Sequence, residues 1–592
     1  MVNNLPPALL FLVAAAIVPL LRSKLKNVLL CLVPVLAFWY ISNLEPGHYL
    51  NLHFLGFDVT LLRVDKLSKV FGYIFTLNAF AAFLYAFHLK DDQQHVATLV
   101  YMGASLGVVF AGDLVTLYCF WEIMAVASTF LILARRTPKA YAAAYRYVLV
   151  HLFGGLVLLA GIMLHLSQTG STAFEPMTQH SLAQWLILAG LLINAAAPPL
   201  HAWLPDAYPE STVTGGVILS AYTTKTAVYT LIRGFPGWEI LVVVGCVMAI
   251  YGIIYALLEN DMRRILAYSI INQVGFMVTG VGIGTAMSLN GAAAHAFCHI
   301  IYKALLWMSA GSVLYMTGKS KCTELGGLYK TMPWTMVFGT VGALAISSVP
   351  WTSGFTSKPL IIEAAVHQHL AWAWLVLEVA SAGVFLHAGI KFPYFVFFAK
   401  DNGLRPGEPP HKTMLWAMGF LAFLCIFLGC YPAPLYHILP FDMEFHSMYQ
   451  AGAVVKQFQL LIFSALVFFL FLKLLKRTDT VALDTDWFYR MGSRAFYWIM
   501  DKILNGVNTL ADRWLVNGLV PWFAGLFGDA PSRLLAALLT PYWAITGASP
   551  DRLGAKRRAV DTAIRTSTSP VGVTAALATA TLTGLMLYML FR

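Results

Sequence analysis

The sequence predicts an all-α integral membrane protein of about sixteen transmembrane helices, with two five-helix repeats inverted relative to each other. Hydrophobic residues make up 59% of the 592 residues and charged residues only 11%, which is typical of a polytopic membrane protein. The apolar stretches are each close to the roughly 20 residues that a helix needs to cross a bilayer. Two of them are interrupted by prolines and are followed by a helix that carries a lysine.

The apolar stretches give the positions of the expected spans. The first lacks a basic segment and a cleavage site, so we expect a retained helix and not a signal peptide. We expect spans at residues 5–22, 27–42, 66–88, 95–112, 113–134, 141–168, 181–204 (broken), 212–233, 240–258, 263–284, 288–317, 336–366 (broken), 372–400, 412–437, 453–476 and 570–591.

These spans divide the chain into six parts. Residues 42–64 alternate in polarity and predict a short extracellular hairpin, whereas two short apolar runs at 514–527 and 534–545 predict amphipathic helices along the membrane surface. The expected parts are 1–94 with the hairpin, 95–233 and 240–400 as the two repeats, 412–476, a lateral cytoplasmic segment at 478–569 and a final transmembrane helix at 570–592.

The distribution of positive charge predicts the orientation. The net charge of +11 comes mainly from lysines and arginines at helix ends, on alternate loops. The positive-inside rule makes that side cytoplasmic and puts both termini outside. The same placement argues against a nucleic-acid partner. The seven cysteines are scattered without a C-x-x-C motif, so we expect no iron–sulfur or zinc site and no cofactor.

The internal repeat is the most informative pattern. In the first unit a Pro-Pro pair at 198–199 breaks a helix, and Lys225 lies near the middle of the next one; in the second unit Lys358 stands in the break and Lys391 in the next span. Broken helices are tolerated in a bilayer only where protein or water satisfies the freed backbone groups. An odd number of spans per unit inverts the second unit. The pattern indicates an ion path.

Glu122 and the lysines are candidates for carrying charge along that path. A carboxylate inside an apolar helix, as Glu122 is, becomes neutral when buried alone and stays ionised near a cation. The alternative interpretation is that Glu122 lies at a helix end among lipid head groups. Lys225, Lys358 and Lys391 can form part of the path, or extend their ammonium groups to the membrane surface.

His295, His299 and Lys303 recur every four residues and therefore share one face of a helix. Histidine titrates nearest to neutral pH, which suits proton transfer. Structural hydrogen bonding is an alternative. Metal binding is another, but the following lysine opposes a cation.

Three further residues are weaker candidates for the first half. Arg146 lies near a membrane edge, His151 lies inside a span and His201 lies beside the first break. Arg146 and His151 are equally compatible with helix packing. His201 can line the path or pair with carbonyls that the break frees.

At these residues the chain resembles the antiporter-like family, which comprises the large membrane-arm subunits of respiratory complex I, related hydrogenase subunits and the A and D subunits of Mrp-type cation/proton antiporters. The resemblance covers roughly residues 60–430. It rests on FWEIM with Glu122, PPLHAWLPDAYPESTVTGG, KTAVYTLIR with Lys225, ENDMRRILAYSIINQVGF, HAFCHIIYKALLWMSAGSVLYMTG and GFTSKPL.

The resemblance implies a hydrated polar axis through Glu122, Lys225, His295, His299, Lys303 and Lys358. One position departs from the family pattern, because Asn194 stands where the first broken helix usually carries lysine. We therefore expect Glu122 to pair with Lys225 or Arg146 instead, or the first half not to translocate in the usual way. The tail is similar to the distal complex I subunit, whereas DTDWFYR at 484–490 is similar to Mrp D chains.

The resemblance implies an ion transporter component rather than an enzyme. We expect exchange of H⁺ for Na⁺ or another monovalent cation within a multisubunit Mrp-type complex in the bacterial inner membrane, with other membrane subunits and the lipid bilayer as partners. Three alternatives stay open: a proton-pumping subunit of a complex I-like or hydrogenase complex, which is part of a translocase; a coupling subunit for inorganic carbon uptake; and a non-conducting scaffold.

Overall fold

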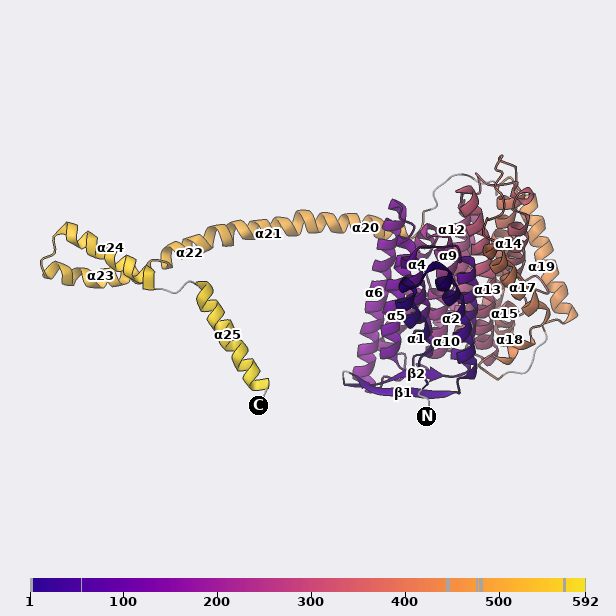
Figure 1. Ribbon diagram of the computed structural model, residues 1–592, viewed down its shortest axis with the longest axis horizontal. Coiled ribbons are helices and arrows are strands. Elements are labelled where there is room, and N and C mark those ends of the chain that lie inside the picture. The colour runs from indigo at the N-terminus through magenta and orange to yellow at the C-terminus, as the bar shows by residue number, and fades with distance from the viewer. Residues whose placement is uncertain are drawn as a thin grey trace. The chain divides into compact units, whose positions relative to one another are not determined.

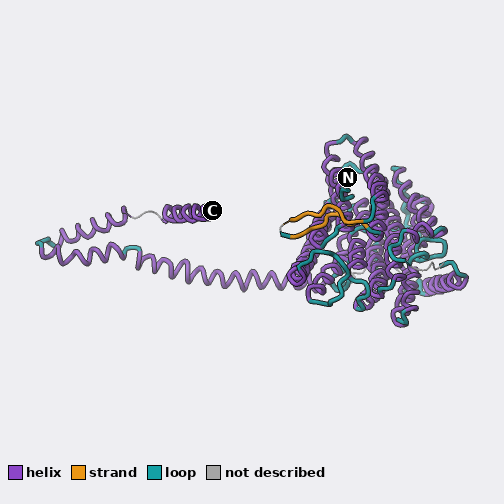
Figure 2. The backbone as a smooth tube through the Cα atoms, turned by 90° about the horizontal axis from the view of Figure 1, so that it is seen from below, coloured by secondary structure: helices purple, strands orange, loops and turns teal. Residues whose placement is uncertain are grey.

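The computed structural model describes residues 4–54, 56–442, 448–474, 478, 483–567 and 571–590. The chain forms two compact units, Met1–Asp486 and Trp487–Arg592. The first is a helical bundle with a β-hairpin across one end (Figures 1 and 2). Within the described ranges, ten helices are long and apolar enough to cross a membrane. The prediction of a mainly helical membrane protein is therefore confirmed.

The N-terminal part of the first unit contains ten α-helices, two short 3₁₀ turns and the hairpin. Its elements are α1 Ala8–Ile17, η1 Val18–Leu20, α2 Ser23–Asn43, β1 Gly47–Phe54, β2 Phe57–Val64, α3 Lys66–Tyr85, α4 Asp92–Phe110, α5 Leu114–Leu133, α6 Pro138–Thr169, α7 Leu182–Asn194, α8 Trp203–Ala207, η2 Tyr208–Glu210, α9 Val213–Leu219 and α10 Thr223–Gly234.

The β-hairpin predicted at 42–64 is present. Its antiparallel strands pair from Gly47 opposite Val64 to Phe54 opposite Phe57. The Thr60 carbonyl accepts from the Gly112 amide over 2.9 Å, and the Thr60 amide donates to Asp113 over 2.8 Å. Asp113 also caps the start of α5, so the hairpin is bonded directly to the α4–α5 junction.

The second half of this unit begins at α11 and surrounds the long helix α13. In the part of the chain that is described, α13 packs against α3, α9, α10, α12, α14, α15 and α17. The elements are α11 Ile240–Leu258, α12 Met262–Ile283, α13 Ala286–Thr317, η3 Leu328–Lys330, α14 Pro333–Ile346, α15 Lys358–His367, α16 Ala371–Val384, the π-helical η4 Phe385–Lys391 and η5 Tyr394–Phe398, α17 Lys412–Cys430, α18 Ala433–His437 and α19 Ala451–Leu470.

Both predicted breaks are present, and the helices before them end in the same way. α7 and α14 each end in a left-handed residue, Ala196 (φ 61°) and Ser348 (φ 58°). In each case the next amide donates to the carbonyl five residues earlier, over 3.0 and 3.2 Å. This bond is the 6→1 hydrogen bond of a Schellman motif. The prolines that follow, at 198 and 350, prevent the helices from continuing.

The prediction of one continuous helix at 212–233 is wrong, because this span is also interrupted. α9 ends at Leu219 and α10 begins at Thr223. The Ser220 carbonyl accepts the Lys225 ammonium over 2.6 Å, and Tyr222, with φ −98° and ψ −67°, is the N-cap of α10. Lys225 therefore lies in the first turn of a short helix and not in the middle of a long one.

The second unit is described by itself and is helical. Its long helical stretch comprises α20 Asp486–Trp498, η6 Ile499–Leu504, α21 Asn505–Ala511, η7 Asp512–Leu519 and α22 Val520–Phe527. α23 Ala530–Ile545 and α24 Pro550–Ser567 pack together, with Ser532 donating to Asp561 over 2.7 Å. The last helix, α25, spans Val571–Leu590. The predicted apolar runs at 514–527 and 534–545 thus fall in helices.

Candidate functional site

A row of buried titratable side chains lies around α13 in the first unit. Each member has an exposed fraction of at most 1%. α13 supplies three members, and the others come from α10, α15 and η4. We call this set the polar row; it consists of Lys225, His295, His299, Lys303, Lys358, His387 and Lys391. The predicted second-half residues are therefore all present in one buried region.

His295 is held by hydrogen bonds on both ring nitrogens. Its Nδ1 lies 3.0 Å from Ser357 Oγ, directly before Lys358, and its Nε2 lies 3.0 Å from Gln273 Oε1. Tyr302 donates to the same Gln273 oxygen over 3.2 Å. Each histidine nitrogen can donate or accept, depending on the tautomer. His295 therefore connects α12, α13 and the second break through hydrogen bonds.

The next two members of the row have polar atoms without a protein partner among the described residues. Both ring nitrogens of His299 and the Lys303 ammonium are buried and unsatisfied. A buried ammonium without an acceptor is costly unless water solvates it or it gives up its proton.

Two other lysines place their ammonium groups on carbonyls that the helix breaks release. Lys225 donates to the Ser220 carbonyl after α9 and to Thr224 Oγ1 over 3.1 Å. Lys358 donates to the Ile346 carbonyl at the end of α14 over 2.9 Å. The last carbonyls of a helix have no intrahelical donor and carry partial negative charge. The breaks thus create the acceptors that hold these cations.

Lys391 follows the same rule at a different helix end. Its ammonium donates to the carbonyls of Ala256, Leu257 and Glu259 over 2.6, 2.8 and 2.7 Å. These residues form the C-terminal end of α11. Lys391 itself ends the π-helical segment η4, and π-helical turns are frequent at functional sites.

Sequence analysis missed His387, which lies four residues before Lys391 on η4. Its Nδ1 contacts the Gly383 carbonyl over 2.8 Å, and its Nε2 is buried without a partner in the described structure. It lies within electrostatic range of Lys303, Lys358 and Lys391. Lys303 in turn interacts with Lys225. A four-residue spacing from a lysine, as in the His295–Lys303 stripe, is the signal that could have identified it.

The first break differs from the second in the group that closes it. Trp203, the first residue of α8, donates its indole Nε1–H to the Ile193 carbonyl over 3.0 Å. Lys358, the first residue of α15, donates to the carbonyl of Ile346 at the end of α14, one position further along the helix end than Ile193 is in α7. Asn194 Oδ1 accepts a 2.9 Å hydrogen bond from His151 Nδ1. Neutral groups therefore stand where the second half has an ammonium.

Glu122 lies apart from the polar row, half-buried in the wall of an apolar cavity of about 750 Å³ between α4 and α5. Its Oε1 is buried with no hydrogen-bond partner in the described part of the chain. Arg146 instead binds Asp206 of α8 over 2.7 and 3.0 Å. The expected pairing of Glu122 with Arg146 or Lys225 is wrong, because both cations are held by other groups.

His201, the last sequence candidate, is fully buried and lies against Asp484. Asp484 lies beyond α19 in the chain, and sequence analysis did not single it out. In the part of the structure that is described, no group of three His, Cys, Asp or Glu side chains could hold a metal ion.

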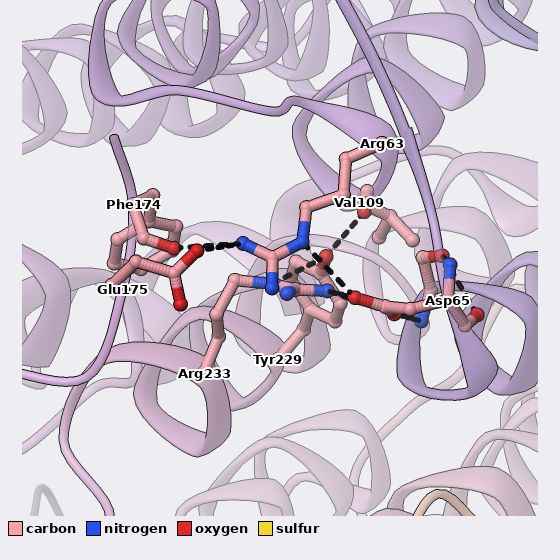
Figure 3. Close-up of polar contacts among 8 residues, drawn as sticks. Arg63, Asp65, Val109, Phe174, Glu175, Tyr229 and Arg233 are labelled. Carbon is pink, nitrogen blue, oxygen red and sulfur yellow. Dashed lines mark hydrogen bonds and ion pairs between the residues drawn. The ribbon is translucent and has the colours of Figure 1, made fainter. Parts of the chain in front are cut away.

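An ion-pair network anchors α10 at the hairpin end of the bundle (Figure 3). Arg233 binds both carboxylate oxygens of Asp65 over 3.0 and 2.8 Å and donates to Tyr229. Arg63, from β2, bridges Asp65 and Glu175 over 3.2 and 2.9 Å. Since Arg233 is in the last turn of α10, this network and the Lys225–Ser220 contact hold the two ends of one short helix.

Residues 111–384 match the model of the family described as "NADH:quinone oxidoreductase/Mrp antiporter, TM". This match covers less than half of the chain. The matched residues include both breaks and all of the polar row except His387 and Lys391. The resemblance to the antiporter-like proteins is thus confirmed.

Two curated relatives extend the comparison. The chain is 29% identical over 410 residues to the A/B subunit of a probable K(+)/H(+) antiporter of Rhizobium meliloti (strain 1021), covering 64% of this chain and 41% of the relative. It is 27% identical over 516 residues to the A1 subunit of a Na(+)/H(+) antiporter of Staphylococcus aureus (strain JH9), covering 74% and 64%. The chain thus spans less than two thirds of the length of either relative.

Two solved structures share the fold. A chain of the Mrp complex from Dietzia sp. DQ12-45-1b matches with a TM-score of 0.66 at 21% identity, covering 74% of this chain and 96% of that one. A chain of the membrane-bound sulfane sulfur reductase, an archaeal respiratory membrane complex, matches with a TM-score of 0.71 at 24% identity, covering 90% and 100%.

Proposed function

We propose that this chain is a proton-translocating subunit that exchanges H⁺ for Na⁺ or another monovalent cation within a multisubunit Mrp-type complex. The observation that carries the proposal is the polar row, in which lysines and histidines lie fully buried around α13. Ionisable residues at membrane depth are expensive and mark ion pathways and proton relays. The names of the two curated antiporter relatives support the same function.

The row supplies two kinds of site for a mobile proton. Lys225, Lys358 and Lys391 hold their charge on helix-end carbonyls, whereas Lys303 and His299 lie between them without a protein acceptor among the described residues. A proton that arrives at Lys303 raises the energy of the charges on its neighbours. Repulsion between successive members then moves protons along the row, and the cation exchanges against them.

The membrane arrangement that we propose has about sixteen spans, two inverted five-helix repeats at 95–233 and 240–400, and both termini outside the cytoplasm. The matching ends of α7 and α14 support the repeat. Access to the row then comes from opposite sides through the two breaks, as in transporters built from inverted repeats. The exposed apolar side chains of the segment 478–569, such as Trp514 and Trp522, suit a lateral position against lipid or other membrane subunits.

The test is cation-driven proton movement in inside-out vesicles that contain the complete complex. Lys358→Ala and Lys303→Ala should each lower the exchange rate by about tenfold or more, because each removes a charge carrier from a continuous row. Lys319→Ala is the control, since that lysine is 47% exposed and pairs with Glu324 outside the row. Wild-type exchange in both row variants, with normal assembly, would overturn the proposal.

A further inference from the structure

The short segment 483–485, at the end of the first unit, is bonded to three different parts of the bundle. Tyr255 of α11 donates to the Leu483 carbonyl over 2.9 Å. Thr485 donates its hydroxyl to the Pro199 carbonyl in the first break over 2.9 Å. Asp484, between them, points into the protein with a side chain that is only 4% exposed.

Asp484 is surrounded by hydrogen-bond donors and one histidine. Tyr251 of α11 and Tyr268 of α12 each donate a hydroxyl to the Asp484 carboxylate. His201 Nε2 lies 3.1 Å from Asp484 Oδ1, and the His201 side chain is fully buried. The His201 ring also packs edge-on against Tyr251, with centroids 4.4 Å apart. One carboxylate therefore joins the first break to α11 and α12.

Among the described residues, Arg264 and Glu259 act electrostatically on Tyr268, which binds this carboxylate. These two residues bind each other over 3.0 Å. Burial by itself raises the pKa of Asp484, but His201 and the two tyrosine hydroxyls outweigh burial and hold the pKa well below its usual value. A buried carboxylate with that balance is ionised.

The location connects the two halves of the proposed path. Pro199 and His201 belong to the first break, whereas Tyr251 and Tyr255 lie on α11, whose end carbonyls hold Lys391. Movement of a proton to or from His201 changes its attraction to Asp484. That attraction acts on the same helix end that binds the terminal lysine of the polar row.

We propose that Asp484 is a positioning residue for ion translocation, which forms with His201 a buried proton-accepting pair that holds the first break against α11 and α12. The inference rests on the proposed function and adds a pair outside the polar row, of which Asp484 also lies outside the segment that matches the family model, because that match ends at residue 384. The chemistry at the pair is the binding and release of one proton by His201 beside a fixed carboxylate.

The experiment compares Asp484→Asn, His201→Gln and the double variant in the complete complex. Both substitutions keep the size of the side chain and remove the pair. We expect a five- to tenfold loss of exchange in each single variant, a shift of the pH profile of exchange to the same new midpoint in all three variants, and no further loss in the double variant. Coupled residues give such non-additive effects. Asp501→Asn is the control, because Asp501 is 63% exposed and pairs with the adjacent Lys502.

A second measurement does not depend on transport. Hydrogen–deuterium exchange of the amides at 195–202 should rise in Asp484→Asn, because the break loses its anchor to α11 and α12. Additive losses in the double variant, or an unchanged pH profile with unchanged amide exchange, would overturn the inference. If the proposed function itself is wrong, the polar-row variants leave exchange unaffected while amide exchange at the break still responds to Asp484.

Discussion

The buried lysines of this protein differ in what stabilises their charge. Lys225, Lys358 and Lys391 donate to carbonyls at the ends of α9, α14 and α11, where the helix dipole favours a cation. Lys303 has no such acceptor among the described residues. At the scale of single residues, Lys303 is therefore the member of the row whose charge depends most on water and on its neighbours.

Glu122 gives a prediction at this scale, because Gly155 of α6 leaves the space that its carboxylate occupies. A Cβ on Gly155 would lie 1.9 Å from Glu122 Oε1. That oxygen is the end of a flexible, half-exposed side chain, so Gly155→Ala should displace the carboxylate and change the free energy of unfolding by less than about 1 kcal/mol. Exchange in vesicles should fall to the level of Glu122→Gln.

The control for this prediction is Gly154→Ala on the same helix. Its Cβ would meet Ile193 at 3.1 Å and would not approach Glu122, so exchange should stay near the wild-type rate. Normal exchange in Gly155→Ala together with loss in Glu122→Gln would show that the position of the carboxylate does not matter.

At the scale of elements, the two broken helices end in the same backbone conformation. They differ in the side chain that donates to a carbonyl at the helix end. Both end in a left-handed residue and a bond to the carbonyl five residues earlier. The first residue after each break then donates to a freed carbonyl, as an indole at Trp203 and as an ammonium at Lys358. Lys358 at the second break can change its charge, whereas the Trp203 indole at the first break does not titrate.

This difference predicts a structural role for Trp203. Trp203→Phe keeps an aromatic ring and leaves the Ile193 carbonyl without its indole donor. The Ile193 carbonyl keeps the Ala196 amide as a donor over 3.0 Å. The free energy of unfolding in detergent should therefore fall by about 0.5–1.5 kcal/mol, the usual net contribution of one hydrogen bond. The pH dependence of exchange should keep its midpoint, since no titrating group is lost.

Trp416→Phe on α17 is the matched control, because that ring is 63% exposed and its loss should change stability by less than about 0.5 kcal/mol. A shifted pH midpoint in Trp203→Phe would contradict the assignment of this tryptophan to structure alone.

The elements also show what sequence could and could not predict. Prolines at 198 and 350 marked both breaks, and the four-residue spacing of His295, His299 and Lys303 placed them on one face. The third break, before Lys225, was missed because it contains no proline. There the Lys225 ammonium, and not a backbone amide, donates to the Ser220 carbonyl. The Trp203 cap depends on a tertiary contact that no local pattern encodes.

At the scale of the whole molecule, charged side chains that are far apart in sequence form pairs within the bundle. Asp484 reaches His201, and Arg233 reaches Asp65 at the hairpin end. Sequence periodicity describes neighbours within one helix, so neither pair could be predicted. Arg233 lies on α10, which carries Lys225, and Asp484 contacts α11, whose end carbonyls hold Lys391. Each pair therefore acts on an element that carries or binds a lysine of the polar row.

The central claim is that the polar row is a hydrated proton path and not a set of charges packed against apolar side chains. The most direct test is a cryo-electron microscopy map of the native complex that resolves ordered water. We predict water within hydrogen-bond distance of Lys303 Nζ and of the nitrogens of His299 and His387 that have no partner among the described residues. A map that shows these three side chains in dry apolar packing would contradict the account.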